Sequence, residues 1–245
     1  MKRPAYSELV ARWKAASKAR MGRLVKIGEA SGYPLFAWEL QGAGPTIYLS
    51  TGIHGDEPSG PVAVTQLLER PPPWFLRCSW LVFPCLNPWG YERNSRKNAK
   101  ALDLNRQWRF RREPEIAAVR RVVGRRKFDL AFLMHEDYDA RGFYLYELVK
   151  EGRPGGEKIL RAIRPHLPLH PLRRIEGRNV ELVGLIRRGG NFNYHRRKRW
   201  PEAFYLVHGH TSHLYNAETP SSGFELAARV RAQRSALRAA VAALA

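Results

Sequence analysis

The stretch TIYLS at residues 46–50, followed by TGIHGDE at residues 51–57, decides how the chain is interpreted. A short apolar run that ends at a turn residue such as Gly52 is typical of a buried strand. In open α/β sheets, ligands bind just beyond the carboxyl ends of the strands. The polar residues His54 and Glu57 follow such an end directly, so they are candidates for a functional site.

The rest of the chain repeats this alternation of apolar strands and helical segments. Further strands are predicted at 80–84, 128–134 and 214–217, helices at 7–20, 60–70, 116–123 and 224–244, and surface loops at 151–155 and 185–201. The alternation predicts a three-layer α/β/α sandwich around a mixed, mostly parallel central sheet. No repeat or linker interrupts the pattern, and residues 1–245 are therefore predicted to form a single domain.

Length and composition fit a soluble globular protein. The 245 residues are 44% hydrophobic, which is ordinary for a chain with a substantial core. The two cysteines, Cys78 and Cys85, lie beside apolar residues and are predicted to be buried free thiols. The N-terminus lacks the apolar region of a signal peptide, and no apolar run is long enough to span a membrane. We therefore expect a cytoplasmic protein without a membrane partner.

The charge is strongly positive: 42 basic and 22 acidic residues give a formal net charge of +20. Such a charge is compatible with nucleic-acid binding, with attraction to anionic surfaces, or with steering of an acidic substrate. The arginines are spread along the chain and do not alternate with aromatic residues, as they would in a platform for single strands. This favours a solvated, arginine-rich surface. The alternative, a non-catalytic nucleic-acid-binding protein, predicts steeply salt-dependent binding and no effect of a chelator.

His54, Glu57 and His135 are the candidate metal ligands. His54 and Glu57 lie three residues apart in one tight loop, and His135 ends the strand at 128–134. Zn²⁺ accepts imidazole nitrogens and a carboxylate oxygen, and three protein ligands leave a fourth position for water. Taken singly, each residue also fits a surface loop or a strand end, and the prediction therefore depends on their combination.

Other polar residues could act beside that metal. Asn105 and Arg106 offer an amide and a planar guanidinium, which suit a carboxylate. Arg96 could stabilise the oxyanion of a tetrahedral intermediate. Glu218, which ends the last predicted strand just before Thr219-Pro220, could accept a proton from water. Each could equally be a solvated basic loop or a strand terminus.

Together these motifs resemble the zinc metallocarboxypeptidase family of the carboxypeptidase A type, over residues 46–220. The turn Asn87-Pro88-Trp89-Gly90 is similar to the family's Asn-Pro-Asp-Gly turn and departs from it at Trp89. The resemblance implies these roles: zinc ligands His54, Glu57 and His135; an acid that orients a histidine ligand, Asp103; an oxyanion arginine, Arg96; a pair that binds the terminal carboxylate, Asn105 and Arg106; and the general base, Glu218.

The resemblance also implies a function. The expected activity is zinc-dependent hydrolysis of a peptide amide bond next to a free terminal carboxylate, with one Zn²⁺ per chain. The Gly-Asp within the first motif is similar to compact bacterial members such as murein peptide amidases. An alternative is a zinc-dependent deacylase of acylated amino acids, resembling aspartoacylase and succinylglutamate desuccinylase. That group shares the His…Glu…His site and an Asp-Leu-Asn-Arg-like element.

Two features leave the substrate open. Tyr194 and Tyr205 are the candidates for the tyrosine that the family carries in its active site. Glu136, Asp137 and Asp139 follow His135 and form either a recognition site for a cationic substrate group or a solvated turn.

Overall fold

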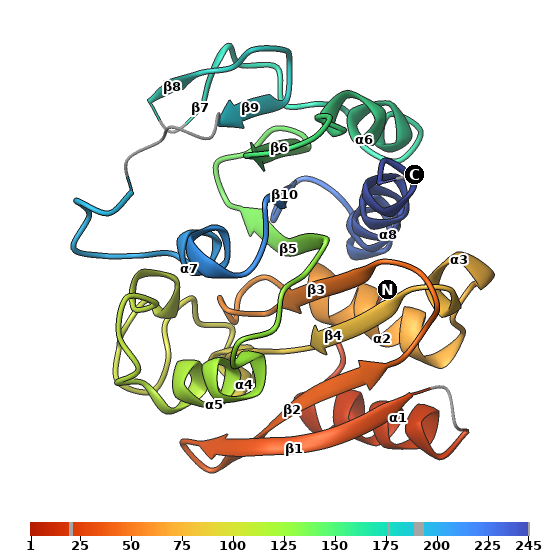
Figure 1. Ribbon diagram of the computed structural model, residues 1–245, viewed down its shortest axis with the longest axis vertical. Coiled ribbons are helices and arrows are strands. Elements are labelled where there is room, and N and C mark those ends of the chain that lie inside the picture. The colour runs from red at the N-terminus through yellow and green to blue at the C-terminus, as the bar shows by residue number, and fades with distance from the viewer. Residues whose placement is uncertain (20–21, 176, 189–193, 245) are drawn as a thin grey trace.

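The computed structural model describes residues 1–19, 22–175, 177–188 and 194–244 (Figure 1). Its central sheet has eight strands in the order β1-β2-β4-β3-β5-β10-β6-β9. These strands are β1 (Arg23–Ala30), β2 (Tyr33–Leu40), β3 (Thr46–Thr51), β4 (Ser79–Phe83), β5 (Leu130–Asp137), β6 (Tyr144–Val149), β9 (Leu185–Arg188) and β10 (His213–Pro220). A separate two-stranded sheet consists of β7 (Arg174–Ile175) and β8 (Arg178–Asn179).

The helices follow the strands along the chain. They are α1 (Tyr6–Lys18), α2 (Ser59–Glu69), α3 (Pro73–Leu76), α4 (Pro88–Arg93), α5 (Pro114–Val123), α6 (Gly156–Ile163), α7 (Glu202–Gly209) and α8 (Leu226–Ala242), with a 3₁₀ turn η1 (Leu104–Arg106). No helix in the described part of the chain is long and apolar enough to cross a membrane.

The sheet is mixed and mostly parallel, as predicted. Strands β4, β3, β5 and β10 form a parallel centre, and β9 lies parallel to β6 at one edge. Antiparallel pairing occurs where β1 meets β2, where β2 meets β4, and where β10 meets β6. The parallel centre brings the carboxyl ends of β3, β5 and β10 to the same edge.

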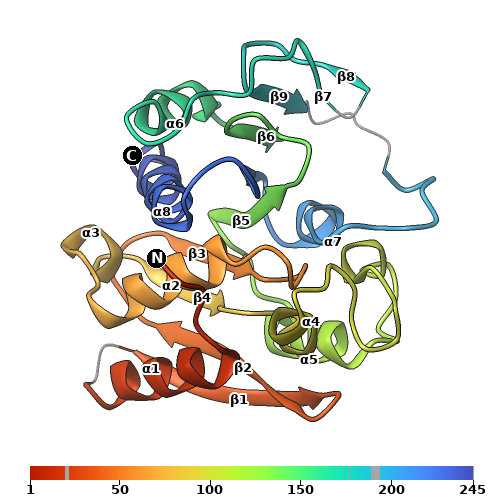
Figure 2. The ribbon, with the colours of Figure 1, turned by 180° about the vertical axis from the view of Figure 1, so that it is seen from behind.

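Helices cover both faces of the sheet, which confirms the three-layer architecture (Figures 1 and 2). Because successive strand residues point to opposite faces, Ile47 and Leu49 pack with one core cluster and Tyr48 with the other. The first cluster includes side chains from α1, α2, α6 and α8, and the second includes side chains from α5 and α7. On β5, Ala131 and Leu133 face the second cluster, and His135 continues the same alternation.

The predicted helices and strands are present with slightly different ends, but several elements were missed. The missed elements are β1, β2, β6, β7, β8, β9, α3, α4, η1, α6 and α7. The stretch 185–201, predicted as loop, begins with β9, and residues 189–193 within it lie outside the described residues.

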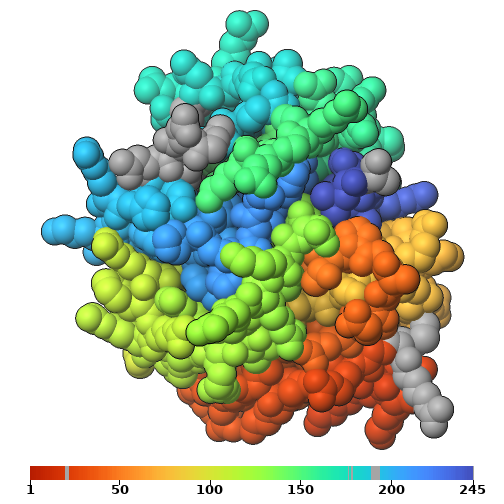
Figure 3. All heavy atoms as spheres, viewed as in Figure 1, coloured from red at the N-terminus to blue at the C-terminus, as the bar shows by residue number. Residues whose placement is uncertain are grey.

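The segment around η1 lies against the start of α7, although the two are far apart in sequence. Trp108 N–H donates to the carbonyl of Trp200, and Trp108 stacks on Tyr205 with ring centroids 5.3 Å apart. In the space-filling view, the yellow-green surface of the segment near residues 100–125 borders the blue surface of α7 (Figure 3). This contact places η1 beside the carboxyl edge of the parallel strands.

Candidate active site

The strand register explains why distant residues meet at one edge of the sheet. Glu218 on β10 pairs with His135 on β5 and with Tyr144 on β6. Residues directly opposite each other on neighbouring strands point to the same face. His135, Glu218 and Tyr144 therefore form a row across three strands. The loop after β3 brings His54 and Glu57 to the same place.

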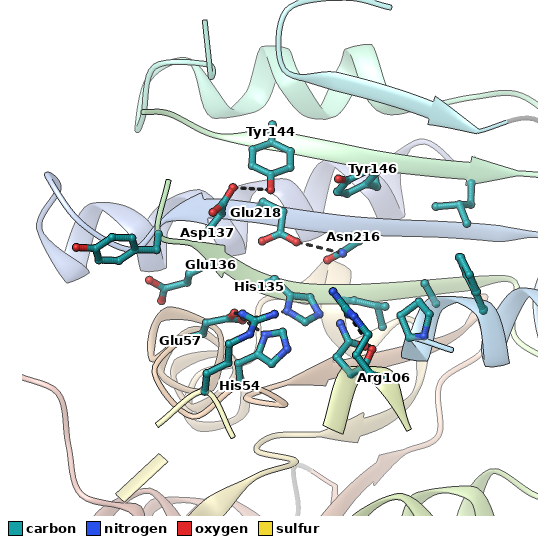
Figure 4. A pocket seen from close by; sticks show the side chains of 18 of the residues that line it. His54, Glu57, Arg106, His135, Glu136, Asp137, Tyr144, Tyr146, Asn216 and Glu218 are labelled. Carbon is teal, nitrogen blue, oxygen red and sulfur yellow. Dashed lines mark hydrogen bonds and ion pairs between the residues drawn. The ribbon is translucent and has the colours of Figure 1, made fainter. Parts of the chain in front are cut away.

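The three predicted metal ligands converge. The Nδ1 atom of His54 lies 2.5 Å from Oε1 of Glu57, and Nδ1 of His135 lies 2.9 Å from Oε2 of the same carboxylate (Figure 4). Their potential ligand atoms all lie within 4.8 Å of one another, and all three side chains are buried. Two imidazoles and one carboxylate form a donor set that fits Zn²⁺ and other divalent metals.

Burial and charge act in opposite directions on these groups. Burial lowers the pKa of His54, but the Glu57 charge and the Asp103 hydrogen bond outweigh it and raise the pKa to about 9. Burial raises the pKa of Glu57, but His54 and His135 outweigh it and lower the pKa to about 2. The carboxylate is thus ionised, and a cation that binds here displaces a proton from His54.

Asp103 and Arg96 flank the His54–Glu57 pair. Asp103 Oδ1 lies 3.2 Å from Nε2 of His54, on the side of the ring away from Glu57. This contact fixes the orientation of the imidazole, as the resemblance implies for Asp103. Arg96 donates to Glu57 Oε1 and to Asp103 Oδ2, each at 3.4 Å. Its guanidinium is partly exposed and therefore accessible from the cavity.

The loop that carries His54 and Glu57 is held by its contact with α4. Asn87 caps that helix by accepting a hydrogen bond from Gly90 N–H at 3.0 Å, and Pro88 occupies the first helical position. Gly55 N–H donates to the carbonyl of Ser95 at 3.0 Å. A Cβ on Gly55 would lie 2.0 Å from the carbonyl carbon of Gly90, so only glycine permits this approach.

Asn105 and Arg106 reach the cavity from η1. The Oδ1 atom of Asn105 accepts the N–H of Glu202, the first residue of α7, at 2.9 Å. Since its oxygen is used, the amide offers its Nδ2 donors to a ligand. Arg106 donates to the carbonyl of Asn105 at 2.9 Å and lines the cavity beside it. Both residues thus present donors, which suits an anionic ligand group.

All seven predicted site residues line one cavity of about 570 Å³. The lining is His54, Glu57, Arg96, Asn105, Arg106, Leu133, His135, Glu136, Asp137, Tyr138, Asp139, Tyr144, Tyr146, Leu148, Arg188, Arg197, Arg199, Pro201, Ala203, Phe204, Asn216 and Glu218. Asn216 donates to Glu218 Oε1 at 3.2 Å. The cavity thus combines the His54–Glu57–His135 cluster, a carboxylate and several guanidinium groups.

Asn216, Tyr144 and Tyr146 also line the cavity and were not predicted from the sequence. Asn216 could have been found by counting two residues back from Glu218 along the strand, because alternate residues share a face. Tyr144 and Tyr146 show the same alternation, but their strand β6 was not predicted.

Three residues that the sequence analysis left with open alternatives, Tyr194, Tyr205 and Glu136, are not placed for a role in substrate recognition. Tyr194 and Tyr205 are not among the residues that line the cavity. Glu136 is buried, accepts Ser59 N–H at 2.5 Å and pairs with Arg229, so its carboxylate serves the fold. A recognition role for Glu136 is therefore not supported.

The chain is similar to known proteins in part of its sequence and in its fold. Residues 43–145 match the family model of the succinylglutamate desuccinylase/aspartoacylase catalytic domain. A comparison with curated protein sequences gave no match.

Solved structures share the fold. A Shewanella amazonensis protein described as a "putative metallopeptidase" is 20% identical, with a TM-score of 0.80 over 98% of this chain and 93% of its own. A metallo-carboxypeptidase from Burkholderia cenocepacia is 20% identical, with a TM-score of 0.71 over 98% of this chain and 69% of its own. Carboxypeptidase A from Helicoverpa armigera is 16% identical, with a TM-score of 0.68 over 99% of this chain and 74% of its own.

The fold is therefore that of the metallo-carboxypeptidases. The fold agrees with the carboxypeptidase-like fold that the motifs predict. Over residues 43–145 the chain is similar to a hydrolase catalytic domain, and His54, Glu57 and His135 are grouped so that they could hold a metal ion.

Proposed function

We propose that the protein is a zinc-dependent metallocarboxypeptidase, which hydrolyses an amide bond next to the free terminal carboxylate of a peptide. The observation that carries this proposal is the convergence of His54 and His135 on the two oxygens of Glu57. The same cavity contains a carboxylate that can act as a base and donors that can bind an anion.

His54, Glu57 and His135 would hold one Zn²⁺ per chain. When bound, the metal polarises the substrate carbonyl and makes water a better nucleophile at neutral pH. Asp103 would keep the His54 ring in its orientation through the contact between Asp103 Oδ1 and His54 Nε2.

Glu218 is the proposed general base. It lies opposite His135 in the strand register, and Asn216 fixes one of its oxygens. From there Glu218 accepts a proton from the attacking water and returns it to the departing nitrogen. The proposed role of Arg96 is to stabilise negative charge on the carbonyl oxygen, since its guanidinium lies beside the triad.

Asn105 and Arg106 are proposed to hold the terminal carboxylate of the substrate. The amide of Asn105 is oriented by its bond to α7, and Arg106 supplies a permanent positive charge. A carboxylate bound by this pair places the adjacent amide bond near Glu218 and the triad. The proposal thus requires a free carboxylate on the substrate.

The test is hydrolysis of short peptides with a free or an amidated C-terminus, in the presence of zinc. Wild type should cleave the free acids, and Glu218→Gln should lower kcat by at least about a hundredfold while keeping the metal, because proton transfer is lost. A Glu218→Gln protein with wild-type turnover would show that the base is another residue. Equal cleavage of amidated peptides would contradict the role of Asn105 and Arg106.

A second candidate is a zinc-dependent deacylase of acylated amino acids, with the same site. It is favoured by the match of residues 43–145 to the succinylglutamate desuccinylase/aspartoacylase catalytic domain. Parallel assays on peptides and N-acyl amino acids separate the two functions. Preferential turnover of simple N-acyl amino acids would assign the chain to the deacylases.

A further inference from the structure

One pair of side chains in the cavity, Tyr144 and Asp137, has no part in the function proposed above. Tyr144 lies directly opposite Glu218 on the neighbouring antiparallel strand. Asp137 follows His135 by two residues on β5, so it lies on the same face, about 6.6 Å further along the strand. Both residues line the cavity.

The two side chains hold each other in place. Tyr144 is only 1% exposed, and its hydroxyl donates to Asp137 Oδ2 at 2.8 Å. The N–H of Asp139 donates to the other oxygen, Oδ1, at 2.9 Å. Burial, followed by the charges of Glu218 and Asp137, raises the pKa of Tyr144 well above its usual range. The phenol is thus a fixed, neutral group whose proton is directed at Asp137.

A pair arranged in this way accepts hydrogen bonds. The single proton of Tyr144 is engaged by Asp137, and the phenol oxygen retains a lone pair. The carboxylate of Asp137 retains further acceptor positions and a negative charge. Among the described residues Asp137 forms no ion pair with a lysine or arginine, although the chain carries a net charge of +20. The ligand group that complements this pair is an N–H donor with a positive charge.

The position of the pair assigns this group to one end of the substrate. In Figure 4, Asp137 lies on one side of His135 and Glu218, and Arg106 lies on the other. Tyr144 continues the row beyond Glu218 and donates to Asp137. If Arg106 binds the terminal carboxylate, the acyl part of the scissile amide extends toward Asp137. The cavity therefore has an acceptor subsite on the acyl side and a donor subsite on the carboxylate side.

We infer that Tyr144 and Asp137 form a subsite for a protonated amino group on the acyl side of the scissile amide, and that the preferred substrates are short peptides with a free N-terminus. The inference rests on the function proposed above. It separates such peptides from N-acyl amino acids, whose acyl groups bring no positive charge. An acyl group with its own carboxylate would meet Asp137 as a like charge.

The experiment compares dipeptides with their N-acetyl forms on the zinc-loaded protein. For wild type, kcat/KM should be about tenfold to a hundredfold higher for the free amine, which is the range for a hydrogen bond to a charged group. Asp137→Asn should remove this preference by lowering only the free-amine value. Tyr144→Phe should reduce the preference only partly. The negative charge of Asp137 remains, but the hydrogen bond from Tyr144 that orients its carboxylate is lost.

The matched control is Tyr33→Phe, which removes a phenol that accepts a hydrogen bond from Arg93 outside the cavity. It should leave both substrates unaffected. The preference should also fade above about pH 8, where the substrate's α-amino group loses its proton. Equal turnover of both forms by wild type, or an equal loss of both in Asp137→Asn, would overturn the inference.

A binding measurement keeps this inference distinct from the proposed function. Zinc-loaded Glu218→Gln is titrated calorimetrically with each dipeptide and its N-acetyl form, and the titrations are repeated with Glu218→Gln/Asp137→Asn. Tighter binding of the free amine that disappears in the double variant supports the subsite, even if wild type hydrolyses none of these peptides. Equal affinities in Glu218→Gln refute the subsite and leave amide hydrolysis as a separate question.

Discussion

At the scale of single residues, Glu57 has a double function, because its two carboxylate oxygens face two different imidazoles. The carboxylate is buried, and its negative charge is compensated by His54 and His135. Removing either imidazole leaves this buried charge only partly compensated, which is costly in a low-dielectric interior. The geometry of the triad thus depends on all three residues together.

The first prediction concerns the metal. Wild type should contain about one zinc per chain, and His135→Ala should lose it while circular dichroism shows a folded protein. Plasma mass spectrometry on the purified proteins measures the metal. His208→Ala is the control, since His208 is exposed on α7 and is not part of the cavity. Zinc at the wild-type level in His135→Ala would place the metal elsewhere.

At the scale of helices and strands, the central parallel strands could be predicted from the sequence, and the antiparallel edges could not. The strand β3 is a short apolar run because both of its faces are buried, and such runs are visible in a sequence. The strand β1, in contrast, has charged residues interspersed among apolar ones, and only Ile27 and Ala30 in it are buried. Its position depends on pairing with β2, which a local pattern does not reveal.

Much of the candidate site could be predicted because several of its residues lie near the carboxyl ends of such apolar strands. His54, His135 and Glu218 each stand at the carboxyl end of a central strand, where ligands bind in open sheets. Tyr144 comes from β6, which is antiparallel to β10, and it enters the site at the beginning of its strand. The rule that ligands bind at the carboxyl ends of strands therefore does not predict Tyr144.

The second prediction concerns the contact between the loop after β3 and helix α4. Gly55→Ala should destabilise the protein by about 1–3 kcal/mol or more, because a Cβ there meets the backbone of Gly90 and Tyr91. The displaced loop carries two of the proposed ligands, so zinc affinity should fall as well. Urea unfolding and metal titration measure the two effects.

Gly209→Ala is the matched control for this change. A Cβ on Gly209, the last residue of α7, would meet nothing within 4 Å. This variant should keep its zinc and its stability. If Gly55→Ala behaved in the same way, the close approach of α4 would not be what positions the loop with the proposed metal ligands.

At the scale of the whole molecule, the net charge of +20 is the property that the site itself does not explain. Several arginines do lie within the cavity, among them Arg106, Arg197 and Arg199. A positive surface with further positive charge in the cavity attracts anionic ligands over distances set by the ionic strength. The positive charge can thus raise the rate at which a carboxylate-bearing substrate binds. A separate nucleic-acid site is not needed to explain it.

The last prediction tests this effect of charge on encounter. Between about 0.05 and 0.5 M salt, kcat/KM for a peptide with an additional acidic side chain should fall roughly threefold to tenfold, since added salt shortens the Debye length. The matched peptide without that side chain should show a weaker fall, and kcat should stay unchanged for both, because screening affects encounter more than the chemical step. Stopped-flow measurements with both peptides at several salt concentrations give these values. The nucleic-acid alternative predicts instead that an oligonucleotide binds tightly at low salt and that a chelator does not affect its binding. Equal salt dependence for the two peptides, together with such tight binding, would assign the positive charge to nucleic acid rather than to the substrate.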